Sequence, residues 1–139
     1  MKAAGIIIAI FIAGLLTGCA SPAELPQGSE AAGKAEYHKI TAAQAKDMMA
    51  NTADYILLDV RTEEEYQENR LDGAILIPDY EIGSRAENEL PDKDVLILIY
   101  CRSGRRSALA AEELILSGYT NVYDFGGIID WPYETVSGD

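Results

Sequence analysis

One seven-residue segment combines a candidate nucleophile with clustered positive charge: Cys101-Arg102-Ser103-Gly104-Arg105-Arg106-Ser107. The thiolate is the nucleophilic form of cysteine, and arginine side chains supply positive charge that is not titrated away. Gly104 permits a backbone conformation that a Cβ atom would penalise, so the N–H groups after Cys101 can curve around a bound anion. The segment therefore predicts an anion-binding loop that favours the thiolate of Cys101, with that sulfur as the nucleophile of a covalent reaction.

The two best-patterned elements of the chain flank this loop. Residues 95–100 (VLILIY) form a continuous apolar run that predicts a buried strand. Residues 107–116 predict an amphipathic helix with Leu109, Leu114 and Ile115 facing the core and Gly118 ending it. Cys101 would then lie at the carboxyl end of a strand, where the helix N-terminus adds its own N–H donors and dipole to an anion site.

The rest of the domain alternates short strands and helices. The predicted strands cover residues 37–40, 55–60, 74–77 and 122–125, and a weakly patterned helix covers 82–90. Thr41 can cap a helix to about residue 50, and Thr62 and Glu65 form the ends of a capping box. This alternation predicts an α/β fold with a mostly parallel sheet and helices on both faces.

The N-terminal residues predict export. Lys2 precedes an uncharged, mostly apolar run over residues 3–16, which is shorter than the roughly 20 residues of a membrane-spanning helix. The run ends in Leu16-Thr17-Gly18-Cys19, which resembles a bacterial lipobox. We expect a lipoprotein signal peptide (1–18), a flexible tether with acylated Cys19 (19–36), the domain (37–132) and a C-terminal tail (133–139). The protein would be exported and anchored to a membrane, at the cell surface or the periplasmic face; the alternative is an ordinary signal peptide with an incidental cysteine.

Composition narrows the possible functions. The chain has 139 residues, which predicts one domain, and its formal net charge of −12 argues against a nucleic-acid binder that works through a basic surface. With His38 as the one histidine, a His-rich metal site is excluded, and Cys19 and Cys101 cannot make a disulfide framework. We expect a monomer.

Four segments of the domain resemble rhodanese-like sulfurtransferase domains, and the likeness extends over residues 37–131. The most specific is the loop itself, Tyr100 to Ser107. The others are Asp59-Val60-Arg61 with Glu65-Tyr66, the segment Leu71-Asp72-Gly73-Ala74-Ile75-Leu76-Ile77-Pro78, and Gly126-Gly127 with Trp131. Arg70-Leu71 stands where many members of the family have a histidine followed by an isoleucine or leucine.

The resemblance implies a thiosulfate or persulfide sulfurtransferase that needs no metal or organic cofactor. The Cys101 thiolate would take the outer sulfur of a small anionic donor such as thiosulfate, and a thiol or cyanide would accept it. The backbone N–H groups of residues 102–106 would hold the persulfide, and the arginine side chains would bind the donor. We expect Asp59 and Arg61 to support the structure through hydrogen bonds and a charge pair with Glu65, the glycine pair to form a turn near the loop, and Trp131 to pack.

Two alternatives come from the same loop. A cysteine-based phosphatase or arsenate reductase also uses a thiolate in an anion cradle, but a phosphatase loop places arginine at the sixth residue after the cysteine. Here that residue is Ser107, and Arg106 is the fifth. The second alternative is a sulfur carrier or binding module that presents a Cys101 persulfide to a partner protein.

Overall fold

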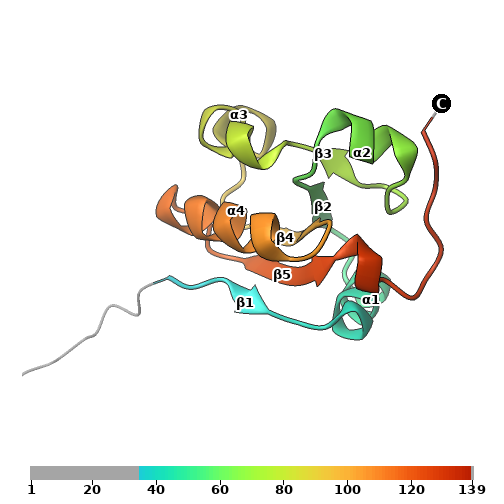
Figure 1. Cartoon of the computed structure of the whole chain (residues 1–139). Helices are drawn as coiled ribbons and strands as arrows, with labels where there is room; N and C mark the ends of the chain where they lie inside the picture. The colour runs from blue at the N-terminus through green and yellow to red at the C-terminus, as the bar shows by residue number, and fades with distance from the viewer. Residues whose placement is uncertain (1–34, 139) are drawn as a thin grey trace, which may run out of the picture. The chain divides into compact units, whose positions relative to one another are not determined.

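The computed structural model describes residues 35–138 as an α/β domain (Figure 1). The expected signal peptide, Cys19 and nearly all of the expected tether lie outside the described residues. Among the residues that are described, no helix is long and apolar enough to cross a membrane.

Five parallel strands form one sheet in the order β1-β5-β4-β2-β3. The strands are β1 (His38–Lys39), β2 (Tyr55–Asp59), β3 (Ile75–Leu76), β4 (Leu96–Cys101) and β5 (Val122–Gly127). All six residues of β4 are buried, because this strand is central in the sheet and covered on both faces. The predicted parallel sheet is confirmed, and the carboxyl ends of β2, β4 and β5 lie along one edge (Figure 1).

Helices cover both faces of the sheet, as predicted. On one face, α3 (Ile82–Glu89) and α4 (Arg105–Leu116) pack on a core that includes Ile97 and Ile99; on the other, α1 (Ala42–Asn51) packs near Leu98 and Tyr100 (Figure 1). Short 3₁₀ turns, η1 (Asp79–Glu81) and η2 (Ile128–Asp130), complete the connections. Successive side chains of β4 point to opposite faces of the sheet, so this one strand contributes residues to the core on each face.

Local sequence signals set where the helices begin. Thr41 caps α1 in a capping box with Gln44, and Thr62 caps α2 (Glu63–Glu68) in a second box with Glu65. Both N-termini agree with the prediction. The chain after Trp131 returns to the domain, where Arg70 and Val136 exchange two backbone hydrogen bonds of 2.8 Å.

The prediction for the buried face of α4 was wrong at one position. Leu109 is 55% exposed, whereas Leu114 is fully buried and Ile115 packs against the core. The helix begins at Arg105, two residues earlier than predicted, and its buried stripe follows the spacing i, i+3, i+4, i+7. That stripe consists of Ser107, Ala110, Ala111 and Leu114. Small side chains therefore let α4 approach the sheet closely, and Leu109 falls outside the stripe.

Candidate active site

The Cys101 loop joins the central strand to the longest helix of the described residues. Cys101 is the last residue of β4, is 1% exposed and forms no disulfide within residues 35–138. Gly104 takes a left-handed conformation (φ 96°) as the N-cap of α4, and its N–H donates to the Cys101 Sγ at 3.0 Å. The chain thus turns back over the sulfur, and the N-terminal end of α4 follows at once. A backbone donor and a helix N-terminus both favour negative charge at that sulfur.

The structure separates the polar residues of the loop into two groups. Ser107 is buried, and its hydroxyl donates to the carbonyl oxygens of Gly104 (3.2 Å) and Gly126 (3.4 Å), so it holds the loop together. Arg102, Ser103 and Arg105 are exposed. Within residues 35–138, the side chains of Arg102 and Arg105 form no hydrogen bond or ion pair, so their charge is available to an anion in solution.

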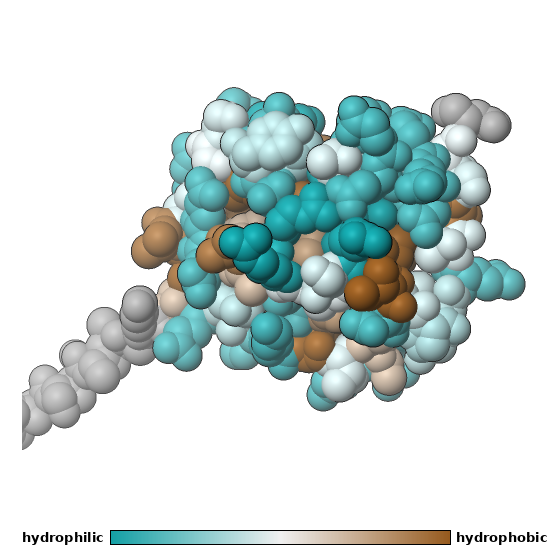
Figure 2. Space-filling model, in the orientation of Figure 1, coloured by the Kyte–Doolittle hydropathy of each residue, from teal (hydrophilic) through white to brown (hydrophobic). Residues whose placement is uncertain are grey.

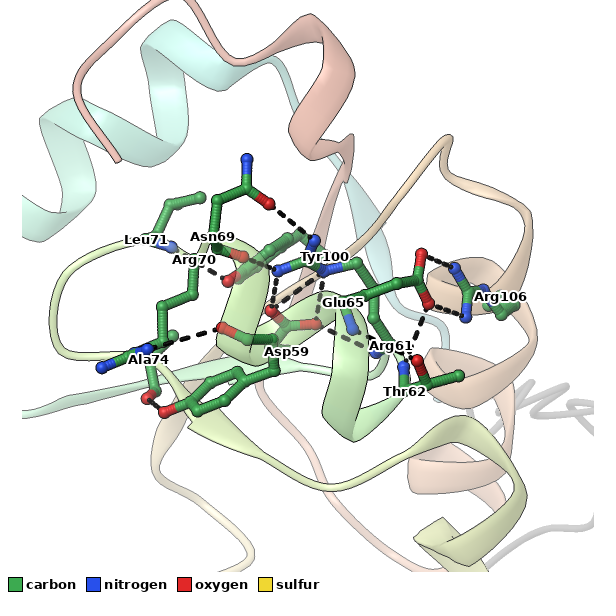
Figure 3. A network of polar contacts seen from close by, with 11 residues as sticks. Asp59, Arg61, Thr62, Glu65, Asn69, Arg70, Leu71, Ala74, Tyr100 and Arg106 are labelled. Atoms are coloured by element: carbon green, nitrogen blue, oxygen red, sulfur yellow. Dashed lines mark hydrogen bonds and ion pairs between the residues drawn. The ribbon is translucent and has the colours of Figure 1, made fainter. Parts of the chain in front are cut away.

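Arg106 is already engaged. Its guanidinium donates to both carboxylate oxygens of Glu65, at 2.7 and 2.8 Å, which ties the first turn of α4 to α2 (Figure 3). The hydrogen bonds from Arg106 lower the pKa of Glu65 to about 2, and the same bonds raise the pKa of Arg106. Here the structure corrects the sequence prediction: Glu65 was expected to pair with Asp59 and Arg61, but it pairs with the loop.

The Glu65–Arg106 pair makes stability depend on pH. The pKa of Glu65 falls from 4.5 to about 2 on folding, so the pair stabilises the fold fully above pH 4.5 and loses its effect as pH falls towards 2. With allowance for solvent screening of a partly exposed pair, Glu65→Gln should lower the free energy of unfolding at pH 7 by about 1–2 kcal/mol. Urea unfolding from pH 7 to 2.5 should show this difference shrinking, while Glu68→Gln, at an exposed position of the same helix, stays close to wild type. A difference that is constant with pH would contradict the ion pair.

Asp59 and Arg61 form a separate, buried pair behind the loop (Figure 3). Arg61 donates to Asp59 through Nε (3.0 Å) and Nη2 (2.7 Å), and its backbone N–H donates to the same carboxylate at 2.9 Å. Nη2 also donates to the carbonyl oxygen of Asn69 at 2.6 Å. Burial alone would lower the pKa of Arg61, but its hydrogen bonds to Asp59 outweigh this and the net pKa is raised. The pair therefore connects the end of β2 to Asn69 at the end of α2. Glu65, in the first turn of α2, in turn binds Arg106 of α4.

Tyr100 completes this network. Its ring is fully buried, its hydroxyl accepts a hydrogen bond of 3.2 Å from the Leu71 N–H, and burial raises its pKa. The Arg61 guanidinium lies 5.6 Å from the Tyr100 ring centroid. These contacts agree with the structural role expected for Asp59 and Arg61.

The end of β5 forms one wall of the loop. Cys101 is paired with Gly127 after a register shift, and a Cβ atom on Gly127 would overlap the Arg102 carbonyl and lie 2.6 Å from the Ser103 Cα. Only glycine allows so close an approach of two backbones. Gly126 and Gly127 were expected to form a turn, but the structure places them as the last two residues of β5, at its register shift and in contact with the loop.

An open pocket of about 400 Å³ lies beside the loop. It is lined by Arg61, Glu65, Glu68, Asn69, Arg102, Ile128 and Ile129. On the face shown in Figure 2, hydrophobic residues form small separate patches within a largely hydrophilic surface. Among the described residues, no three His, Cys, Asp or Glu side chains gather as metal ligands would. At the loop itself, the structure places the Cys101 thiol next to a backbone N–H donor and to the exposed arginines Arg102 and Arg105.

Sequence reasoning missed two contributors to the site. Glu65 was identified as a capping residue, but its bond to Arg106 links residues 41 positions apart, a distance at which no local pattern operates. Asp124 was not singled out, although it is fully buried and its side chain accepts a hydrogen bond from the Gly126 N–H. An aspartate two residues before a glycine is a typical turn signal and could have been noticed.

The chain is similar to known proteins. The family model for the rhodanese-like domain matches residues 41–132. Thiosulfate sulfurtransferase PspE of Escherichia coli strain K12 is 41% identical over 81 residues, which cover 58% of this chain and 78% of PspE. A sulfurtransferase of Allochromatium vinosum is 36% identical over 95 residues, covering 68% of this chain and 87% of its own.

A solved structure is similar to this chain in both sequence and fold. A rhodanese with anions from E. coli has 39% sequence identity and a TM-score of 0.57 in a match that covers 60% of this chain and 99% of the other. The family model spans well over half of the chain and includes the Cys101 loop and its supporting network. Both relatives described above are named as sulfurtransferases, and the chain belongs to the rhodanese-like domain family.

Proposed function

We propose that this protein is a sulfurtransferase that carries a sulfane sulfur as a persulfide on Cys101. The observation that carries the proposal is the Gly104 N–H aimed at the Cys101 Sγ at the N-terminus of α4. Such an arrangement favours the thiolate before reaction and the persulfide anion after it. Homology to sulfurtransferases supports sulfur transfer in general; the donor, the acceptor and the intermediate are our proposal.

The first half-reaction has thiosulfate as its donor. The Cys101 thiolate attacks the outer sulfur, a new S–S bond forms, and the bond to the sulfonate sulfur breaks with its electron pair leaving as sulfite. Two negative charges leave with sulfite and one stays on the persulfide, so charge is balanced. Arg102 and Arg105 bind the donor because their exposed charge is not used by a partner among the described residues. The similarity to a rhodanese that was solved with anions supports an anionic donor.

The second half-reaction regenerates the thiolate. Cyanide or a thiol attacks the outer sulfur of the persulfide, and the S–S bond breaks with its electrons returning to Cys101. With cyanide the product is thiocyanate, whose formation can be followed by its absorbance with ferric iron. Because the sulfur rests on the protein between the two steps, ping-pong kinetics are expected. Thiocyanate formation from thiosulfate and cyanide therefore tests the proposal, and its absence with a range of sulfane donors would refute it.

The phosphatase alternative has less support from the geometry. A phosphatase needs its loop arginine to grip phosphate oxygens. Here the nearest candidate is Arg106, and its Nη1 and Nη2 atoms already donate hydrogen bonds to the Glu65 carboxylate. The carrier alternative shares the persulfide; a stable Cys101 persulfide with negligible turnover on small acceptors would favour it.

The three loop arginines should differ in their contributions. Arg102→Ala and Arg105→Ala should each raise the KM for thiosulfate about fivefold, which corresponds to about 1 kcal/mol for one exposed charge, with little change in stability. Added salt should reduce this effect. Arg106→Ala should also destabilise the fold, because it leaves Glu65 without its partner. Steady-state kinetics and urea unfolding of the three variants check this, and an unchanged KM in both Arg102→Ala and Arg105→Ala would show that these two arginines carry only solvated charge.

We also propose that the domain is exported and held at a membrane through acylated Cys19, on the cell surface or the periplasmic face. The proposal depends on the sequence of residues 1–19 alone, which lie outside the described structure. The anchor would place the domain at a membrane surface, where sulfur donors and acceptors reach it from the aqueous side.

A further inference from the structure

Asp124 is a buried acidic residue without a charged partner among residues 35–138. It lies in β5 and is fully buried. Its side chain is on the same face of the sheet as that of Val122, which is the face that α4 covers. One carboxylate oxygen, Oδ1, accepts a hydrogen bond of 2.9 Å from the Gly126 N–H. The other, Oδ2, is buried and has no hydrogen-bond partner in the described part of the chain. A buried polar atom without a partner destabilises a fold, so this side chain calls for a reason beyond packing.

The hydrogen bond from the Gly126 N–H to Asp124 shapes the end of β5. A side-chain oxygen that accepts from the N–H two residues on mimics a backbone turn, and Gly126 takes a left-handed conformation here (φ 91°). The turn orients the Gly126 carbonyl so that it accepts the Ser107 hydroxyl of α4 at 3.4 Å. It also brings the backbone of Gly126 near Gly104, where a Cβ atom would lie 3.3 Å from the Gly126 Cα.

Gly127, the residue after Gly126, makes the contact between β5 and the Cys101 loop. Gly127 lies so close to Arg102 and Ser103 that no side chain fits between them, and it is paired with Cys101. In addition, the Ile129 N–H donates to the Arg102 carbonyl at 3.2 Å. Residues 101–104 direct the Gly104 N–H at the sulfur, and the end of β5 packs against them. Asp124 determines the conformation of that end of β5 and so supports the loop.

We propose that Asp124 is a positioning residue for the Cys101 loop: it acts through Gly126 and Gly127 at the end of β5 and touches neither the substrate nor the sulfur. The inference deepens the proposed function, since the reaction it serves is sulfur transfer at Cys101. The loop needs the Asp124 oxygen that accepts from the Gly126 N–H, and an amide can supply that oxygen as well as a carboxylate, because Oδ2 has no hydrogen-bond partner in the described part of the chain.

Two substitutions of Asp124 are expected to have different effects. Asp124→Asn keeps an acceptor oxygen of the same reach and removes the charge, whereas Asp124→Ala removes both. We expect Asp124→Ala to lower kcat for sulfur transfer by about 10- to 100-fold, the scale reported for small misplacements of reacting groups, with KM for thiosulfate nearly unchanged. Asp124→Asn should restore kcat to within about twofold of wild type.

The chain offers a matched control. Asp92 Oδ1 accepts the Asp94 N–H at 2.9 Å in the same two-residue turn, but it is exposed and precedes the opposite end of β4. Asp92→Ala should therefore leave kcat and KM unchanged. The four proteins (wild type, Asp124→Ala, Asp124→Asn and Asp92→Ala) are compared as the full chain in thiosulfate and cyanide kinetics, and folding is checked by near-ultraviolet circular dichroism.

A second measurement does not depend on activity. Amide hydrogen exchange at Gly104, followed by NMR, reports the turn over the sulfur directly. Exchange should accelerate at least about tenfold in Asp124→Ala and stay near wild type in Asp124→Asn and Asp92→Ala. If Asp124→Ala does not fold, Asp124→Asn still decides. Wild-type kcat and exchange in the asparagine variant support the proposal, and loss of either overturns it.

The outcomes also distinguish this inference from the proposed function. A wild-type chain that transfers no sulfur contradicts the proposed function, and the Gly104 exchange rates then judge Asp124 alone. A wild-type chain that transfers sulfur, together with an Asp124→Ala variant that does so equally well, contradicts the positioning role and leaves the proposed function standing.

Discussion

Replacing Cys101 with serine is expected to abolish sulfur transfer and leave the fold intact. A serine hydroxyl is not ionised at neutral pH and forms no persulfide, so the activity should fall at least about a thousandfold, as it does when a nucleophile that works in a catalytic unit is removed. The fold should persist because serine is smaller than cysteine and the Gly104 N–H, which now donates to sulfur at 3.0 Å, can donate to the serine oxygen. Thiocyanate formation measures the first effect, and urea unfolding the second.

The other cysteine of the chain supplies the control. Cys19→Ser should leave turnover of the detergent-solubilised protein unchanged, because the proposed chemistry involves Cys101 alone. Residual activity of Cys101→Ser above a few per cent of wild type would show that sulfur is transferred without this thiol, and the covalent mechanism would be wrong.

Arg61→Ala should have the largest effect on stability. It leaves the Asp59 carboxylate fully buried without its charged partner, and of the groups within residues 35–138 that donate to this carboxylate, the backbone N–H of residue 61 is the one that remains. Breaking a buried pair in this way costs about 3–5 kcal/mol, because the remaining charge has neither water nor a counter-ion. For a domain of this size, the Tm should fall by more than about 10 °C. The link from β2 to Asn69 is lost in the same step, so α2 loses one of the contacts that hold it to the domain.

An exposed arginine gives the comparison. Arg85 also pairs with carboxylates, Glu81 and Glu89, but its side chain is 39% exposed. Exposed pairs contribute about 0–1 kcal/mol, so Arg85→Ala should lower the Tm by only a few degrees. Equal losses of stability in Arg61→Ala and Arg85→Ala would show that burial of the Asp59–Arg61 pair has no energetic consequence.

The features predicted well from the sequence are those that neighbouring residues determine. The apolar run of residues 95–100 predicted β4 because a strand covered on both faces needs no polar position. The capping boxes at Thr41 and Thr62 predicted two helix N-termini, since each involves residues only three apart. The Cys101 loop could be assigned to a strand–helix junction because both flanking elements had clear patterns.

What could not be predicted depends on which segments meet in space. Leu109 was placed in the core because it is apolar, but the close approach of α4 to the sheet selects the small side chains of Ala110 and Ala111 for the buried stripe. Glu65 was paired with its sequence neighbours, yet the fold brings Arg106 to it from α4. Gly127 could not be explained from the sequence either, because what excludes a side chain there is its contact with Arg102 and Ser103, which lie 24 or more residues away in the chain.

The central claim, that Cys101 accepts sulfur, is tested most directly by the mass of the intact chain after incubation with thiosulfate. The account predicts a gain of one sulfur atom in wild type and in Cys19→Ser, located on the peptide that contains Cys101 and absent in Cys101→Ser. Addition of cyanide should remove the extra mass and release thiocyanate. No gain with thiosulfate or with persulfide donors, or a gain that persists in Cys101→Ser, would contradict it.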